Sequence, residues 1–112
     1  DVAANLKQVA IDENTNIVIV THDHKDDAAA LKVVIDSPAR YIGMIGSINK
    51  VNTCFELLKQ EGVDALKLKK VFSPIGIDIG GEKPEEISLA IMAEIQAVKH
   101  GKNVPSLKKG LK

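Results

Sequence analysis

Two short apolar runs, each followed by a turn and an amphipathic helix, most constrain the fold of this chain. Residues 17–20 are a continuous β-branched run, and residues 41–45 are a second apolar run. Both runs are too short for a helix and lack polar alternation. Each therefore predicts a strand that is covered on both faces, as in a parallel sheet. The helices between such strands are expected to form right-handed crossovers.

The remaining pattern extends this strand–helix alternation. A third strand is predicted to begin at Val71 and Phe72, and a glycine-rich loop covers residues 74–81. Pro84 is a favoured first helical residue and predicts the start of the last helix. The other helices are predicted from apolar spacing over residues 2–10, 25–36, 48–61 and 64–70.

This order predicts an α/β fold: a three-layer Rossmann-like parallel sheet with flanking helices, of which only the second half is present. We expect one domain over residues 1–112, with residues 102–112 as a lysine-containing tail. Three strands make a narrow sheet with exposed edges. The sheet is therefore expected to be completed by a missing segment or a companion chain, or by a second copy in a homo-oligomer.

Composition excludes several classes of function. The 15 basic and 15 acidic residues cancel, and aromatic residues are only 3%, so nucleic acid is not an expected partner. No apolar run approaches the roughly 18 residues of a membrane span. The single cysteine indicates a reducing compartment such as the cytoplasm. Because Cys54 lies on the apolar stripe of its helix, we predict a packed core thiol.

The loop Thr21-His22-Asp23-His24 follows the first predicted strand, and open parallel sheets bind ligands at the carboxyl ends of their strands. Three interpretations are open. The two histidines could ligate a metal with Asp23 or Asp27. Thr21 and backbone amides could hold an anion at the helix start. Alternatively, Asp23 or Thr21 simply caps the helix, with solvated histidines.

A metal-dependent hydrolase is an alternative on the same residues. Thr-His-x-His-x-Asp after an apolar strand resembles the metal motif of the metallo-β-lactamase fold. In that family another histidine follows, where this chain has Asp27. The family also needs more histidines downstream, and only His100 remains.

A second group of candidates lies where the second strand turns into a helix. Gly43 and Gly46 flank the strand end, and Gly46 would let the backbone approach a ligand closely. Ser47 could cap the helix or bind an anion there, and Lys50 would add a positive charge one turn later. The pattern matches neither a dinucleotide fingerprint nor a P-loop, so a plain capped helix is an equal alternative.

A third group joins the glycine loop to the last helix. Gly76 and Asp78 lie in the loop, where glycine indicates a positive φ or close packing. Glu94 falls within the apolar stripe of the last helix, so its carboxylate must be hydrogen-bonded, paired or protonated. It could face a functional cleft, or it could reach solvent or a backbone amide.

Taken together, these motifs resemble the carboxyl-terminal Rossmann-like domain of the XdhC/CoxI family over residues 5–101. The residues that carry the resemblance occur in a fixed order along the chain. They are Thr21-His22-Asp23-His24, Asp27, Tyr41-Ile42-Gly43, Gly46-Ser47, Lys50, Pro74-Ile75-Gly76, Asp78-Ile79-Gly80, Pro84-Glu85-Glu86-Ile87 and Ala93-Glu94-Ile95.

The resemblance implies an accessory factor for molybdenum hydroxylases such as xanthine dehydrogenase, although some members carry the name xanthine dehydrogenase. Such factors bind the molybdenum cofactor and deliver it, in sulfurated form, to the apo-enzyme. They are maturation chaperones and not the dehydrogenase itself. The family's first βαβ unit, with its glycine-rich nucleotide turn, is absent from these residues, so NAD(P) binding is left open. The implied cofactor-binding positions are Thr21, His22, Asp23, Asp27, Gly43, Gly46, Ser47, Lys50, Gly76, Asp78 and Glu94.

Overall fold

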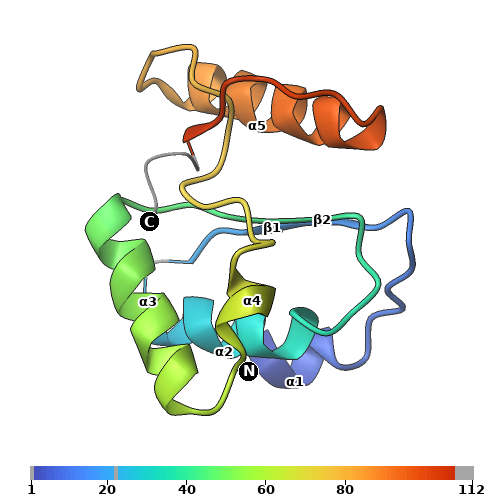
Figure 1. Ribbon diagram of the computed structural model, residues 1–112, viewed down its shortest axis with the longest axis vertical. Coiled ribbons are helices and arrows are strands. Elements are labelled where there is room, and N and C mark those ends of the chain that lie inside the picture. The colour runs from blue at the N-terminus through green and yellow to red at the C-terminus, as the bar shows by residue number, and fades with distance from the viewer. Residues whose placement is uncertain (1, 22, 108–112) are drawn as a thin grey trace.

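The computed structural model describes residues 2–21 and 23–107 and shows a two-stranded parallel sheet between two helical layers. In Figure 1 the helices α1 to α4 lie on one face of the strands, and α5 lies on the other. This arrangement confirms the predicted α/β, Rossmann-like class. The elements are α1 (Val2–Leu6), β1 (Asn16–Ile19), α2 (His24–Val34), β2 (Tyr41–Met44), α3 (Ile48–Gln60), α4 (Ala65–Leu68) and α5 (Pro84–Lys99).

The predicted order of the helices and of the first two strands is confirmed, and several elements end earlier than predicted. The first helix ends at Leu6, whereas the spacing predicted a helix to residue 10. The helix after β2 stops where Gly62 takes a φ of 94°, a conformation that favours glycine. No helix in the described part of the chain is both long and apolar enough to cross a membrane.

The sheet is narrower than predicted. β1 and β2 run parallel, with Asn16 opposite Tyr41 and Ile19 opposite Met44. The predicted third strand is a single parallel bridge: the N–H of Phe72 donates to Ile42 O at 2.9 Å, and the N–H of Met44 donates to Phe72 O at 3.0 Å. The ladder stops there because Pro74 has no N–H to donate.

The main core fills the space between the sheet and α2, α3 and α4. Its buried side chains include Ile19, Leu31, Val34, Met44, Val51, Leu58 and Leu68. The expected cover on both faces holds for β2, where Tyr41 and Met44 are each 1% exposed. It is wrong for the first apolar run, where Val18 in β1 is 39% exposed and Val20, just after β1, is 62% exposed. α5 contacts the β2 side through Tyr41 and leaves this face of β1 open.

The carboxyl-terminal segment returns to the glycine loop. The N–H of Asp78 donates to Pro105 O at 2.9 Å, and the N–H of Leu107 donates to Gly76 O at 3.1 Å. Residues 105–107 are therefore paired, in contrast to the predicted tail, because backbone groups of the loop need hydrogen-bond partners. The rest of that predicted tail, residues 108–112, lies outside the described residues.

Candidate functional site

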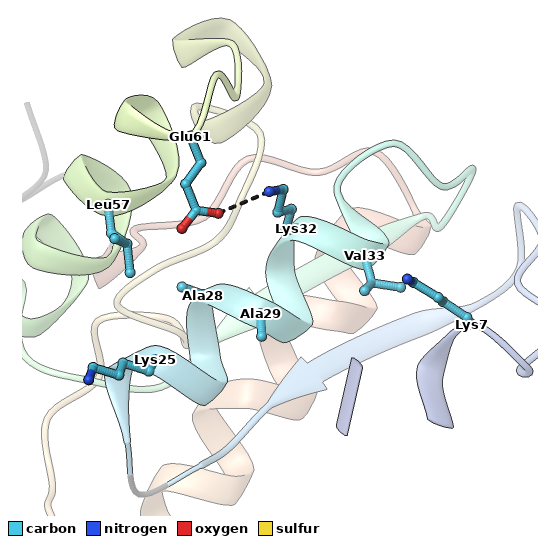
Figure 2. A pocket seen from close by; sticks show the side chains of 8 residues that line it. All are labelled: Lys7, Lys25, Ala28, Ala29, Lys32, Val33, Leu57 and Glu61. Carbon is cyan, nitrogen blue, oxygen red and sulfur yellow. Dashed lines mark hydrogen bonds and ion pairs between the residues drawn. The ribbon is translucent and has the colours of Figure 1, made fainter. Parts of the chain in front are cut away.

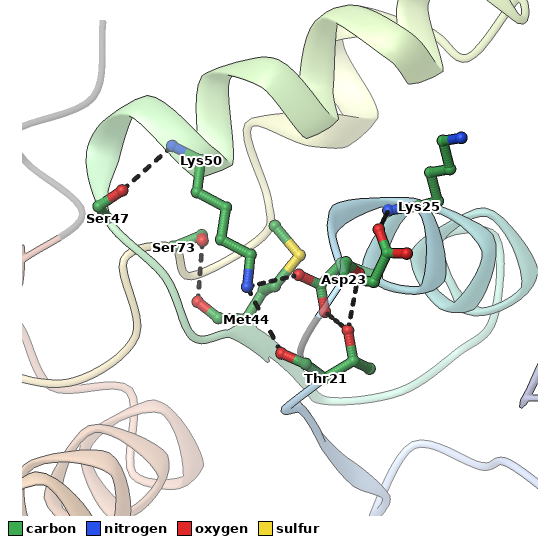
Figure 3. A network of polar contacts seen from close by, with 8 residues as sticks. Thr21, Asp23, Lys25, Met44, Ser47, Lys50 and Ser73 are labelled. Carbon is green, nitrogen blue, oxygen red and sulfur yellow. Dashed lines mark hydrogen bonds and ion pairs between the residues drawn. The ribbon is translucent and has the colours of Figure 1, made fainter.

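The carboxyl ends of β1 and β2 meet the starts of α2 and α3 at one edge of the sheet (Figure 3). Lys50, in the first turn of α3, points back across this edge. Its Nζ lies 3.4 Å from the backbone oxygen of Thr21 and 3.3 Å from Oδ2 of Asp27. The structure thus brings two of the predicted groups of residues into one polar network, which we call the β-edge network: Thr21, Asp23, Asp27, Ser47 and Lys50.

Asp27 is the buried member of the β-edge network, with only 1% of its surface exposed. Its Oδ1 lies 2.5 Å from the hydroxyl oxygen of Thr21, which also lies 2.9 Å from the backbone oxygen of Asp23. Its Oδ2 has no hydrogen-bond partner among the described residues, although the Lys50 ammonium is within ion-pair distance. Asp27 is therefore placed to hold Lys50 and Thr21 and is too buried to meet a large ligand itself.

Both helices at this edge begin with a side-chain cap. Oδ1 of Asp23 accepts a hydrogen bond from the N–H of Lys25 at 2.8 Å, and Oγ of Ser47 accepts from the N–H of Lys50 at 3.2 Å. The capping interpretation is therefore confirmed for Asp23 and Ser47. Capping does not exclude ligand binding, since the other first-turn N–H groups still favour an anion at the helix start.

Gly46 shapes the turn between β2 and α3. Its φ of 147° is in the region that favours glycine. A Cβ at this position would lie 3.2 Å from Cδ of Lys50. The absence of a side chain therefore lets the Lys50 stem fold back over the turn toward β1.

Glu94 is the centre of a second buried network, on the α5 face of the sheet. Its Oε1 accepts from the hydroxyl of Tyr41 at 2.7 Å and from the N–H of Gly76 at 3.0 Å, and its Oε2 accepts from the hydroxyl of Ser106 at 2.6 Å. We call Tyr41, Gly76, Glu94 and Ser106 the Glu94 network. Of the alternatives for Glu94, the contact with a backbone amide is the one observed.

Tyr41 and Ser106 are the members of the Glu94 network that sequence reasoning missed. Burial, followed by the hydrogen bond to Glu94 and the charge of Glu94, raises the pKa of Tyr41 well above its usual range. The phenol thus remains a neutral donor. A signal was available for Tyr41, because a tyrosine within a buried strand needs a partner for its hydroxyl.

The glycines of the α5 face are explained by close packing. A Cβ on Gly43 would lie 2.5 Å from Cδ1 of Ile75 and 2.6 Å from the hydroxyl oxygen of Tyr41. Gly76 has a φ of 107°, and a Cβ there would lie 3.2 Å from Cβ of Ala90. Together with Asp78, these residues belong to the packing of α5 and the glycine loop, whereas the β-edge network lies at the starts of α2 and α3.

Cys54 is fully buried, which confirms the predicted core thiol. Burial, followed by the charge of Asp27, raises the pKa of this thiol to about 11, against the opposing charge of Lys50. His22 lies outside the described residues, as does the side chain of His24, which begins α2. Within the described part, no three histidine, cysteine or acidic side chains gather as a metal site would require.

The model of the XdhC Rossmann domain matches residues 2–95 of this chain. The chain belongs to the XdhC family. The match covers both the β-edge network and Glu94, so it confirms the resemblance drawn from the motifs. It leaves the individual roles of these residues as predictions.

Curated relatives of this XdhC domain are similar over most of its length. It is 30% identical to the uncharacterized protein YqeB of Escherichia coli over 91 residues, which are 81% of this chain and 17% of YqeB. It is 32% identical to a probable xanthine dehydrogenase subunit of Bacillus subtilis over 78 residues, which are 70% of this chain and 22% of that protein.

A solved structure shows the same fold. The crystal structure of a xanthine dehydrogenase from Bacillus halodurans superimposes with a TM-score of 0.72 at 25% identity, over 92% of this chain and 29% of that chain. The chain thus spans less than a third of the length of each of these relatives.

Proposed function

We propose that this XdhC domain works within a cytoplasmic accessory factor that helps to bind the sulfurated molybdenum cofactor and insert it into a xanthine dehydrogenase-type apo-enzyme. The similarity to a probable xanthine dehydrogenase subunit supports the link to such an enzyme. The observation that carries the proposal is the fixed cation of the β-edge network. Lys50 is held beside a capped helix start at the carboxyl edge of a parallel sheet, where such folds bind ligands.

The residues of this edge fit the phosphate end of a pterin cofactor. The side chain of Lys50 is 31% exposed, so its ammonium can reach a ligand while it stays paired with Asp27. The first-turn amides of α3 and the bare backbone at Gly46 would add donors and space. The cofactor would supply the molybdenum and sulfur chemistry, and this chain would hold and orient it.

Removing the cation is expected to weaken cofactor binding. Lys50→Ala should lower the affinity about tenfold or more, since one charge-assisted hydrogen bond is worth about 1.5–3 kcal/mol. The double variant Lys50→Ala/Asp27→Asn also lacks the cation but leaves no unpaired buried carboxylate, so it separates binding from folding. His22→Ala tests the adjoining loop, and Lys59→Ala removes a lysine from the last turn of the same helix as a control.

The measurement is a titration of the isolated cofactor, kept under anoxic conditions, followed by the quenching of its fluorescence or by calorimetry. Unchanged affinity in both the Lys50 and His22 variants would overturn the assignment of the site. An equal loss in the Lys59 control would show that the effect is general surface charge.

A docking role is a second candidate, favoured by the open side of the sheet. In the described residues β1 pairs only with β2, and Val18 and Val20 lie exposed on one face. We propose that a further strand completes the sheet at β1, either from another segment of the same protein or from a second chain. Such an edge is a template for strand pairing.

Charges on this open face are expected to prevent the docking. Val18→Lys/Val20→Lys should abolish any self-association through β1 while leaving the thermal midpoint within a few degrees, because surface substitutions change stability by about 0.5 kcal/mol or less. Val9→Lys is the matched control, at a valine that is 55% exposed and outside the strands. Sedimentation velocity provides the readout. A stable wild-type monomer at micromolar concentration would count against pairing between copies.

A further inference from the structure

A groove on the helical layer is lined by apolar side chains and rimmed by lysines. A hollow of about 790 Å³ lies between α1, α2 and α3 (Figure 2). We call this hollow the α2–α3 groove. A second hollow of about 500 Å³, lined mainly by polar residues, shares Lys25 and Leu57 with it. The lining of the larger hollow includes the apolar Ala28, Ala29, Val33 and Leu57 and the basic Lys7, Lys25 and Lys32.

The rim of this groove carries a net positive charge. Lys32 is paired with Glu61 at 3.0 Å, and both side chains are partly exposed. Lys7 and Lys25 have no ion-pair partner among the described residues. Figure 2 shows these two lysines at opposite ends of the hollow, with the alanines of α2 between them. A matching surface would present large apolar side chains beside an acidic one.

α5 carries such a surface. Leu89 is 62% exposed and Met92 is 61% exposed, and Glu85 is also exposed. Spacings of four and three residues place the three side chains on one helix face. We call them the α5 stripe. Because α5 and the groove lie on opposite faces of the sheet (Figure 1), the stripe cannot reach the groove of its own chain.

We propose that the α5 stripe of one copy binds in the α2–α3 groove of a second copy. Glu85 then lies toward Lys25 at one end of the groove, and Leu89 and Met92 pack on its apolar side chains. The lengths agree, since Lys25 to Lys32 and Glu85 to Met92 each span seven residues, about 10 Å of helix. The small side chains of Ala28 and Ala29 allow a helix to approach closely, as in other helix-in-groove complexes.

The proposed contact joins two different surfaces, so a pair of copies still has one free stripe, on one copy, and one free groove, on the other. Such heterologous contacts build rings or open chains. A single helix face buries less area than a standard stable interface, so association is expected only at concentrations on the order of 0.1 mM or above.

Complementation between two variants tests this contact. All chains carry Val18→Lys/Val20→Lys, and the chain with only these two changes is the background chain. Pairing at β1 then cannot contribute to association, so this test is independent of the proposed docking role at β1. The groove variant adds Lys25→Glu/Ala29→Glu, and the stripe variant adds Leu89→Lys/Met92→Lys. Lys59→Glu is the control, at an exposed lysine that lines neither hollow.

Sedimentation velocity over a concentration series is the readout, with thermal unfolding as the check that each variant folds. Each variant alone should associate at least about tenfold more weakly than the background chain, because substitution of a central contact residue weakens binding by about this much. An equimolar mixture should form a one-to-one dimer, because one intact stripe then meets one intact groove. A background chain that stays monomeric, variants that associate like it, or a mixture without dimer would overturn the proposal.

Discussion

Replacing Glu94 by leucine is expected to lower the unfolding free energy of the domain by about 3–5 kcal/mol. Leucine fills similar space but accepts no hydrogen bond. The buried hydroxyl of Tyr41 and the N–H of Gly76 would lose the Glu94 acceptor, and the partly exposed Ser106 would lose one hydrogen bond. Each buried donor without a partner costs about 1–3 kcal/mol. Urea unfolding followed by circular dichroism measures the loss.

Glutamine at the same position separates hydrogen bonding from charge. In Glu94→Gln the amide oxygen can still accept from both Tyr41 and Gly76, and the amide nitrogen can donate to the Ser106 oxygen. The glutamine variant should therefore lose no more than about 1 kcal/mol. If leucine were tolerated as well as glutamine, the Glu94 network would not be what holds α5 and the carboxyl-terminal segment to the sheet.

The second large effect concerns the ion pair of the β-edge network, which should respond unequally to removal of its two partners. Lys50→Ala removes the ion-pair partner of the Asp27 carboxylate, which is 1% exposed. This variant is expected to lower the unfolding free energy by about 3 kcal/mol. Asp27→Asn leaves a lysine whose side chain is already 31% exposed and can be solvated, so it should cost about 1 kcal/mol or less.

The double variant Lys50→Ala/Asp27→Asn completes a thermodynamic cycle. It should recover most of the stability lost in Lys50→Ala, because no buried charge then lacks a partner. Equal costs for the two single variants would contradict the view that Asp27 is the buried anchor and Lys50 the group presented to the edge. Lys50→Ala and the double variant are also used in the cofactor titration, so stability and binding can be compared directly for these two proteins.

Local patterns were sufficient for the elements of this fold. The β-branched run at residues 17–20 and the apolar run at residues 41–45 both predict strands. The helical spacing of apolar residues in the α3 and α5 segments predicts helices there. Capping by Asp23 and by Ser47 was one of the alternatives predicted from the sequence, since it acts within three residues of chain. Parallel pairing could be predicted because crossover helices separate the strands.

The number of strands in the sheet and the burial of its two faces could not be predicted from local patterns. The run at Val71 and Phe72 looked like a strand but gives only one bridge, because Pro74 lacks the N–H that would extend the ladder. The exposure of Val18 and Val20 depends on where α5 crosses the sheet, which no local pattern in the β1 segment encodes.

The candidate site shows the same division. Residue types and order along the chain placed Thr21, Asp27 and Lys50 near strand ends, and these residues do meet. The family resemblance grouped Glu94 and Gly76 with them as cofactor-binding positions, whereas in the structure these two contact Tyr41 on the α5 face. Spacing within one element fixes which side chains share a face, whereas contacts between residues 53 positions apart, such as Tyr41 and Glu94, depend on how packed layers come together. The chain alone thus specified its helices and its first two strands. Only the packing of α5 decided which polar residues lie at the ends of the strands and which are buried against α5.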